Sequence, residues 1–179
     1  MVLRSGVIGK KRRGVYIVVS RHIISMKNDC ERFLGDELLQ KASVRGNEFA
    51  WKKEDVIHVI LSAKESRLAS IGGQVQFRFP DGYCELYWIN FDSGDRKEDE
   101  LWDDYVTRSA DEVIKEFNRI NREFDLLDEG YRSFQFLKDK VEKEGVALGD
   151  YLCYVMYFND ENTYWRLLND WQQFTDDET

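Results

Sequence analysis

The sequence predicts an α+β fold, in which an antiparallel sheet built around a hairpin of residues 74–91 packs against several amphipathic helices. From Gln74 to Phe79 polar and apolar residues alternate strictly, and a turn sequence follows at once. Apolar residues at helical spacing dominate the second half of the chain. Strands early and helices late favour α+β over a repeating βαβ design. A length of 179 residues suits one domain, with residues 1–13 and 175–179 able to fray.

Four further elements are expected before the hairpin. Val15–Ser20 is rich in β-branched residues and predicts a strand. The spacing from Asp29 to Lys41 predicts a helix with Asp29 as its N-cap. A turn at 45–47 leads into a short strand at 48–51. The segment 55–66 is interpreted as a helix, although its wide apolar face also allows a strand.

The hairpin turn is Phe-Pro-Asp-Gly-Tyr, which suits a three-residue loop of Pro80, Asp81 and Gly82. This loop places Phe79 opposite Tyr83 and predicts two sheet faces. The inner face would hold Val75, Phe77, Phe79, Tyr83, Tyr87, Ile89 and Phe91, with Glu85 as an exception at its margin. The outer face would hold Gln74, Gln76, Arg78, Cys84, Leu86 and Trp88. The glycine pair at 72–73 predicts a bulge or bend rather than a phosphate-binding loop.

Helices are expected after residue 108. Ser109-Ala-Asp-Glu112 matches a capping box and predicts a helix start, followed by an apolar stripe from Val113 to Leu127. Gly130 is expected to end or bend this helix.

The last part of the chain contains two more predicted helices and one ambiguous segment. Residues 134–141 have helical spacing, and Gly145 provides a stop. Residues 164–174 predict a C-terminal helix. Between them, residues 150–158 fit either a helix or a strand.

The net charge of −8 is unevenly distributed. Residues 1–53 carry 12 Lys or Arg against 5 Asp or Glu, a net +7, whereas residues 54–179 carry 14 against 29, a net −15. The acidic majority argues against nucleic acid as a partner, because nucleic-acid binding depends on neutralising phosphates. The basic run Lys10–Arg13 is the one local exception.

No apolar run is long enough for a membrane helix, and the N-terminus lacks a signal-peptide pattern, so we expect a cytoplasmic protein. The three cysteines, Cys30, Cys84 and Cys153, are far apart and odd in number, which favours packed free thiols over a disulfide framework or a metal site.

The motifs of known enzyme classes are missing. The two histidines, His22 and His58, stand alone in sequence, and no zinc, P-loop, dinucleotide or nucleophile-elbow motif occurs. We therefore predict no catalytic residue, no metal and no cofactor. An unfamiliar enzyme that combines carboxylates such as Glu85 with a histidine is the alternative.

The strongest candidate site is an acidic run with tryptophans near it. Tryptophans can anchor a partner while carboxylates steer a basic one. The sequence therefore predicts a binding protein for a basic protein partner, of which an immunity-type inhibitor of a bacterial toxin is one example. An oligomeric scaffold, with a homo-oligomer interface in its Tyr/Trp-rich C-terminal half, is a further alternative. The predicted partner-binding residues are Trp88, Asp92, Asp95, Asp99, Glu100, Trp102, Asp103 and Asp104.

Overall fold

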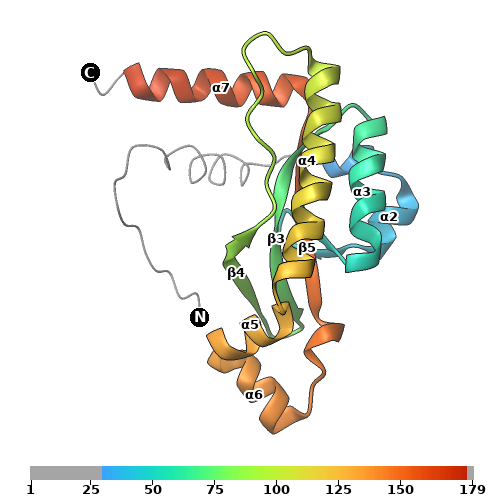
Figure 1. Cartoon of the computed structure of the whole chain (residues 1–179), viewed down its shortest axis with the longest axis vertical. Helices are drawn as coiled ribbons and strands as arrows, with labels where there is room; N and C mark the ends of the chain where they lie inside the picture. The colour runs from blue at the N-terminus through green and yellow to red at the C-terminus, as the bar shows by residue number, and fades with distance from the viewer. Residues whose placement is uncertain (1–29, 177–179) are drawn as a thin grey trace.

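The computed structural model describes residues 30–176, and the predicted α+β fold is confirmed there. Five strands form one antiparallel sheet in the order β1-β2-β5-β3-β4 (Figure 1). β3 and β5, which pair over most of their length, form the centre of the sheet. The strands are β1 (Ser43–Arg45), β2 (Glu48–Trp51), β3 (Ala69–Phe79), β4 (Gly82–Asn90) and β5 (Leu152–Asn159).

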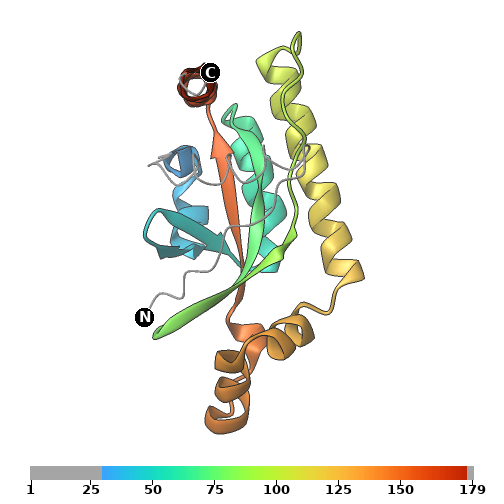
Figure 2. The same cartoon turned by 90° about the vertical axis from the view of Figure 1, so that its left-hand side faces the viewer.

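Two helices, α3 and α4, lie side by side against one face of the sheet (Figures 1 and 2). The main core lies between them and the sheet, and its large fully buried side chains include Phe77, Phe91 and Tyr154. α5 and α6 lie at one end of the sheet, and α7 leaves the other end (Figure 1). The helices are η1 (Cys30–Phe33), α2 (Asp36–Lys41), α3 (Lys53–Glu65), α4 (Trp102–Glu123), α5 (Leu126–Ser133), α6 (Gln135–Glu144), η2 (Leu148–Asp150) and α7 (Glu161–Asp176).

The hairpin exists, but its predicted register is wrong. Phe79 pairs with Gly82 and Phe77 with Cys84, so the loop contains only Pro80 and Asp81. A three-residue loop closed by a G1 bulge would require a left-handed conformation at Gly82, and Gly82 does not adopt one. A shift of one residue moves every side chain of a strand to the opposite face.

The shifted register corrects the predicted faces of β4. Cys84 and Leu86 are buried in the core, whereas Tyr83 and Tyr87 are 53% and 65% exposed. An irregularity in the pairing opposite Gln74 and Gln76 then restores the predicted orientation. After it, the remaining predicted core residues are buried as expected, namely Ile89 and Phe91.

Three helix predictions also change. α4 begins at Trp102, so the predicted capping box at Ser109 lies inside a helix and does not start one. Gly130 lies within α5, where a Cβ atom would come within 2.5 Å of the Phe77 ring, so close packing explains the glycine. The predicted helix over 29–41 is two short pieces, η1 and α2, separated at Leu34 and Gly35.

Other expectations are confirmed. Residues 48–51 form β2, and the helical interpretation of 55–66 is correct in α3. Gly72 lies at an irregularity of β3, and Gly145 ends α6 in a left-handed conformation. The ambiguous segment 150–158 is mainly strand β5. The predicted strand 15–20, the basic run 10–13, Asp29 and His22 lie outside the residues that the structure describes.

Candidate binding surface

The acidic segment 92–101 connects β4 to α4 and is held by one arginine of α4. Arg108 binds Glu100 with two hydrogen bonds, Nε to Oε1 at 2.6 Å and Nη2 to Oε2 at 2.7 Å. The same guanidinium binds both carboxylate oxygens of Glu112, at 3.0 and 2.9 Å, and the carbonyl oxygen of Asp95, at 2.9 Å. Charge-assisted bidentate pairs of this kind fix geometry as well as adding energy. The acidic segment is therefore fastened to a helix at several points.

The pKa values in this network are displaced in the direction that keeps it charged. Hydrogen bonds from Arg108 lower the pKa of Glu100 to about 2. Burial alone would raise the pKa of Glu112, but the Gly94 N–H and Arg108 outweigh it and lower this pKa. Both carboxylates are thus anions at neutral pH, and Arg108 compensates one of their two negative charges.

The predicted acids therefore divide into two groups. Glu100 is turned inward to Arg108, and Asp103 forms an exposed ion pair with Arg67 at 2.8 Å. The other predicted acids have exposed side chains and lie on the segment and the first turn of α4. These are Asp92, Asp95, Asp99 and Asp104.

Trp102 does not lie on this surface. It is only 6% exposed, and its indole Nε1 donates to the carbonyl oxygen of Arg67. Its ring packs against Tyr105 and Tyr164. The predicted anchoring role therefore does not fit its position, and Trp102 instead supports the start of α4.

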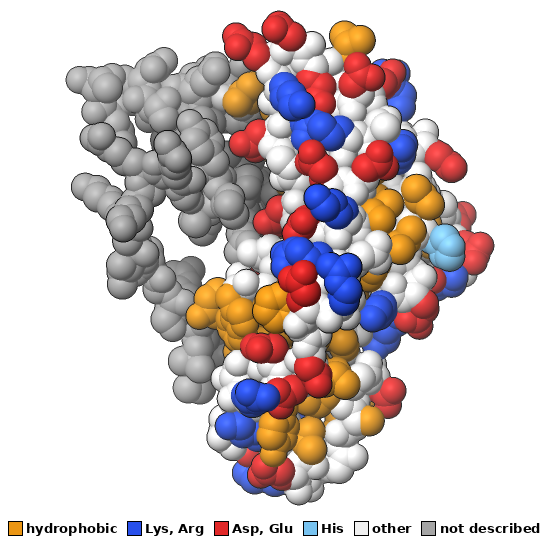
Figure 3. All heavy atoms as spheres, viewed as in Figure 1, with side chains coloured by type: hydrophobic (Ala, Val, Ile, Leu, Met, Phe, Trp, Pro, Cys, Tyr) orange, Lys and Arg blue, Asp and Glu red, His pale blue; other side chains and the backbone are white. Residues whose placement is uncertain are grey.

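Trp88 is exposed, and it belongs to a separate aromatic patch made of Tyr87, Trp88 and Phe134. Tyr87 and Trp88 meet edge to face at 4.8 Å, and Trp88 stacks on Phe134 at 5.9 Å. The irregular pairing of β4 turns these two consecutive residues outward together, as a β-bulge does. Figure 3 shows an apolar patch between β4 and α5, below the mixed charges that cover α4. The structure thus places Trp88 apart from Trp102.

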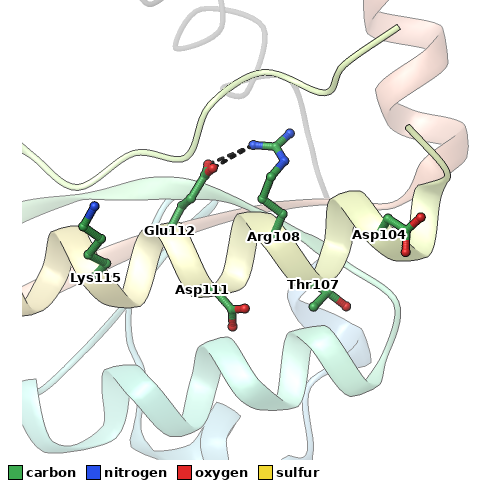
Figure 4. Close-up of a pocket in the computed structure, with 6 residues that line it drawn as sticks. All are labelled: Asp104, Thr107, Arg108, Asp111, Glu112 and Lys115. Carbon is green, nitrogen blue, oxygen red and sulfur yellow. Dashed lines mark hydrogen bonds and ion pairs between the residues drawn. The ribbon is translucent and has the colours of Figure 1, made fainter. Parts of the chain in front are cut away.

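A depression along α4 borders the acidic segment (Figure 4). Arg108 and Glu112 point toward that segment, whereas Thr107 and Asp111 point toward α3. The lining contains neither histidine nor cysteine and mixes both charges. It has the composition of the flank of a charged surface rather than of a catalytic pocket.

Sequence reasoning missed a buried polar network on the other face of the sheet. Arg78, with a side chain only 4% exposed, donates to the Gln76 side chain at 2.8 Å and to Glu48 Oε2 at 3.1 Å. Gln76 donates in turn to Glu85 at 3.3 Å. Arg78 also donates to backbone carbonyls of the β1–β2 hairpin, at Ser43 and Glu48. The network therefore ties that hairpin to β3, and the polar alternation along β3 was its only sequence signal.

The alternative of a carboxylate and histidine site gains no support from this geometry. His58 is exposed on α3, whereas Glu85 bonds Gln76 on the opposite face of the sheet. Within residues 30–176, no group of three or more His, Cys, Asp or Glu side chains is placed to hold a metal ion. None of the helices described is both long and apolar enough to cross a membrane.

Comparisons with known proteins add no relative. No protein-family model matches the chain, and neither a curated protein nor a solved structure is significantly similar to it.

Proposed function

We propose that this chain is a non-enzymatic binding protein that captures a basic protein partner through its acidic segment. The observation that carries this proposal is the attachment of the segment to Arg108, which holds it in one arrangement. Exposed carboxylates that are already in place lose little conformational entropy when a partner arrives. The charge of residues 30–179, which carry 19 Lys or Arg against 33 Asp or Glu, adds a net −14 that attracts cations over a longer range.

The aromatic patch is the proposed anchor. Tyr87 and Trp88 are exposed on an edge strand that leads directly into the acidic segment. Arginine side chains stack well on exposed tryptophan and tyrosine rings, so both parts suit the same class of partner. We place this binding in the cytoplasm, and an immunity-type inhibitor of a cationic bacterial toxin is one protein of this class.

A calorimetric titration with an arginine-rich peptide, at low and high salt, tests the acidic segment. The test variant neutralises three exposed acids of the acidic segment and the first turn of α4. The control neutralises three exposed acids of α2 and α3, so the net charge of the two variants is the same. Loss of three exposed charge contacts should weaken binding about tenfold at low salt. The control removes the same net charge but no contact of the proposed site, so it should weaken binding much less than the test variant does. The test variant is Glu98→Gln, Asp99→Asn and Asp104→Asn; the control is Asp36→Asn, Glu54→Gln and Glu65→Gln.

A second pair of variants tests the anchor. Trp88→Ala should weaken binding of the peptide about two- to fivefold through lost cation–π contact. Phe33→Ala, which removes a ring that is 61% exposed on η1, should leave binding unchanged. Equal weakening by both triple variants, or binding that ignores salt, would show that only bulk charge is at work and would refute a defined site.

A further inference from the structure

Arg67 has a backbone conformation that is unusual for its residue type. Among residues 30–176 it is the only residue other than glycine with a positive φ, which is 59°. It follows the end of α3, where the Leu68 N–H donates to the Ala63 carbonyl oxygen at 2.9 Å. Glycine is the usual residue at such a helix end, because it lacks a Cβ atom. For any other residue type the left-handed conformation makes folding about 5- to 30-fold less favourable.

The backbone of Arg67 has a role that does not require an arginine. Its carbonyl oxygen accepts a hydrogen bond from Nε1 of Trp102 at 2.9 Å, which helps to dock the start of α4. A glycine would offer the same carbonyl oxygen. The reason for an arginine therefore lies in its side chain, whose Nε donates to Oδ1 of Asp103 at 2.8 Å.

The ion pair of Arg67 and Asp103 is weak compared with the one that holds the acidic segment. Its side chains are 67% and 68% exposed. Such an exposed pair makes folding at most about fivefold more favourable, so it does not by itself outweigh the cost of the backbone. Arg108, in contrast, is mostly buried and binds both carboxylate oxygens of Glu100 and of Glu112. Arg108 thus fixes the segment, whereas the pair at Asp103 can open.

The same ion pair shows which ligand this carboxylate suits. Asp103 lies in the first turn of α4 beside the exposed Asp104, and a guanidinium already binds it. In the part of the chain that the structure describes, Arg67 contacts only Oδ1 of the carboxylate. An arginine that approaches from solvent can donate to both oxygens, and such a bidentate pair is the stronger one. A partner's arginine can therefore replace Arg67.

We propose that Asp103 is a binding site for an arginine of the basic partner, and that Arg67 occupies this site in the free protein until the partner displaces it. This inference rests on the proposed function. It extends that function by adding Asp103 to the outward acids and by naming the group that this carboxylate binds. Arg67 therefore weakens partner binding, because the ion pair must open before the partner's arginine can bind.

Calorimetric titration of an arginine-rich peptide at low salt tests this inference with two single variants and their combination. Arg67→Gln should bind the peptide about two- to fourfold more tightly than the wild type, because Asp103 is then free. Asp103→Asn should weaken binding more in the Arg67→Gln background than in the wild type. The double variant has the net charge of the wild type and should bind no more tightly than the wild type does.

A matched control separates this effect from net charge. Arg122→Gln removes an arginine that is 71% exposed and pairs with Glu123 at the other end of α4. It changes the net charge as Arg67→Gln does, so it should tighten binding less. Arg67→Gly keeps the carbonyl oxygen for Trp102 and relieves the backbone, so it should melt no lower than the wild type and should also bind more tightly.

Several results would overturn the inference. Equal tightening by Arg67→Gln and Arg122→Gln would leave only net charge. An equal loss on Asp103→Asn in both backgrounds would show that Arg67 does not cover Asp103. A clearly lower Tm of Arg67→Gly would make the arginine a structural residue. Failure of the proposed function gives a different result, in which the peptide binds none of these proteins or binds independently of salt, and the inference then fails with it.

Discussion

Ser109 gives the sharpest test of how α4, which carries the acidic surface, is docked on the sheet. Its hydroxyl accepts a hydrogen bond from the Ser70 N–H of β3 at 3.1 Å and donates to the Val106 carbonyl at 3.1 Å. Both serines are 0% exposed. Ser109→Ala therefore leaves a buried N–H without its acceptor, which costs about 1–3 kcal/mol. Because alanine has the better helix propensity, by up to about 0.5 kcal/mol, the net loss should be about 1–2 kcal/mol.

Thermal unfolding measures this loss directly. For a chain of this size each kcal/mol lowers Tm by about 2–4 °C, so Ser109→Ala should melt about 2–8 °C lower. Hydrogen exchange of the Ser70 amide should accelerate with it. Ser70→Ala is the matched control at the same contact. The Ser70 hydroxyl is buried without a hydrogen-bond partner among the described residues, so its removal should cost nothing or stabilise slightly.

Ser109→Asp distinguishes a helix that starts at Trp102, as observed, from the helix start at Ser109 that the sequence predicts. Aspartate is as good an N-cap as serine, so a helix that began at Ser109 would keep its stability. Inside α4 the same change buries a charge against β3 and should unfold the protein or nearly so. A Ser109→Asp variant with wild-type Tm, together with an unchanged Ser70 amide in Ser109→Ala, would refute the docking described above.

Three further outcomes follow from the structure. The pKa of Glu100 lies at about 2 instead of 4.5, so the stability that its ionised carboxylate adds is complete above pH 4.5 and is lost as the pH falls toward 2. Hydrogen exchange of the acidic segment should therefore accelerate over this pH range. Arg108→Gln should move the pH of this acceleration up toward 4.5. Burial raises the pKa of the Cys153 thiol from 9.0 to about 11, so its thiolate fraction at pH 8 is about 100-fold lower; Ellman's reagent should react at that thiol only on unfolding, and fast reaction with the native protein would contradict its burial. Gly130→Ala should lower the urea midpoint, since overpacking of Phe77 costs about 1–3 kcal/mol against about 1 kcal/mol of helix propensity, and a raised midpoint would contradict the close contact.

The fold class was predictable because periodicity alone decides it. Strict alternation along 74–79 and the helical stripe from Val113 onward both correspond to real elements. Strand β5 was ambiguous for a physical reason. It lies between β2 and β3, and it buries Tyr154 on one face and Val155 on the other. A strand buried on both faces is apolar throughout and has no alternation to detect.

The hairpin register and the start of α4 depended on information that local sequence lacks. Two loop lengths fit Pro80-Asp81-Gly82, and the choice between them sets which side chains reach the core. At α4 the acids Asp103 and Asp104 occupy the first helical turn, where negative charge is favourable. These acids marked a helix start seven residues before the capping box, but the surrounding acidic run obscured the signal.

The acidic surface shows why counting charges along a sequence overestimates a binding site. In the sequence Glu100 counts as one more acid of the run, yet its carboxylate is bound to Arg108, eight residues later in the chain. Trp102, the most conspicuous apolar residue of the run, is buried and therefore closed to a partner. The acids that a partner can contact are a smaller set of outward carboxylates. Their arrangement depends on the ion pair between Glu100 and Arg108. A variant that removes Arg108 should therefore disturb binding even though Arg108 repels a basic partner. Net charge alone predicts the opposite result, tighter binding, because Arg108→Gln removes a positive charge. The sign of the change in peptide affinity therefore decides between a surface whose geometry Arg108 fixes and attraction by net charge.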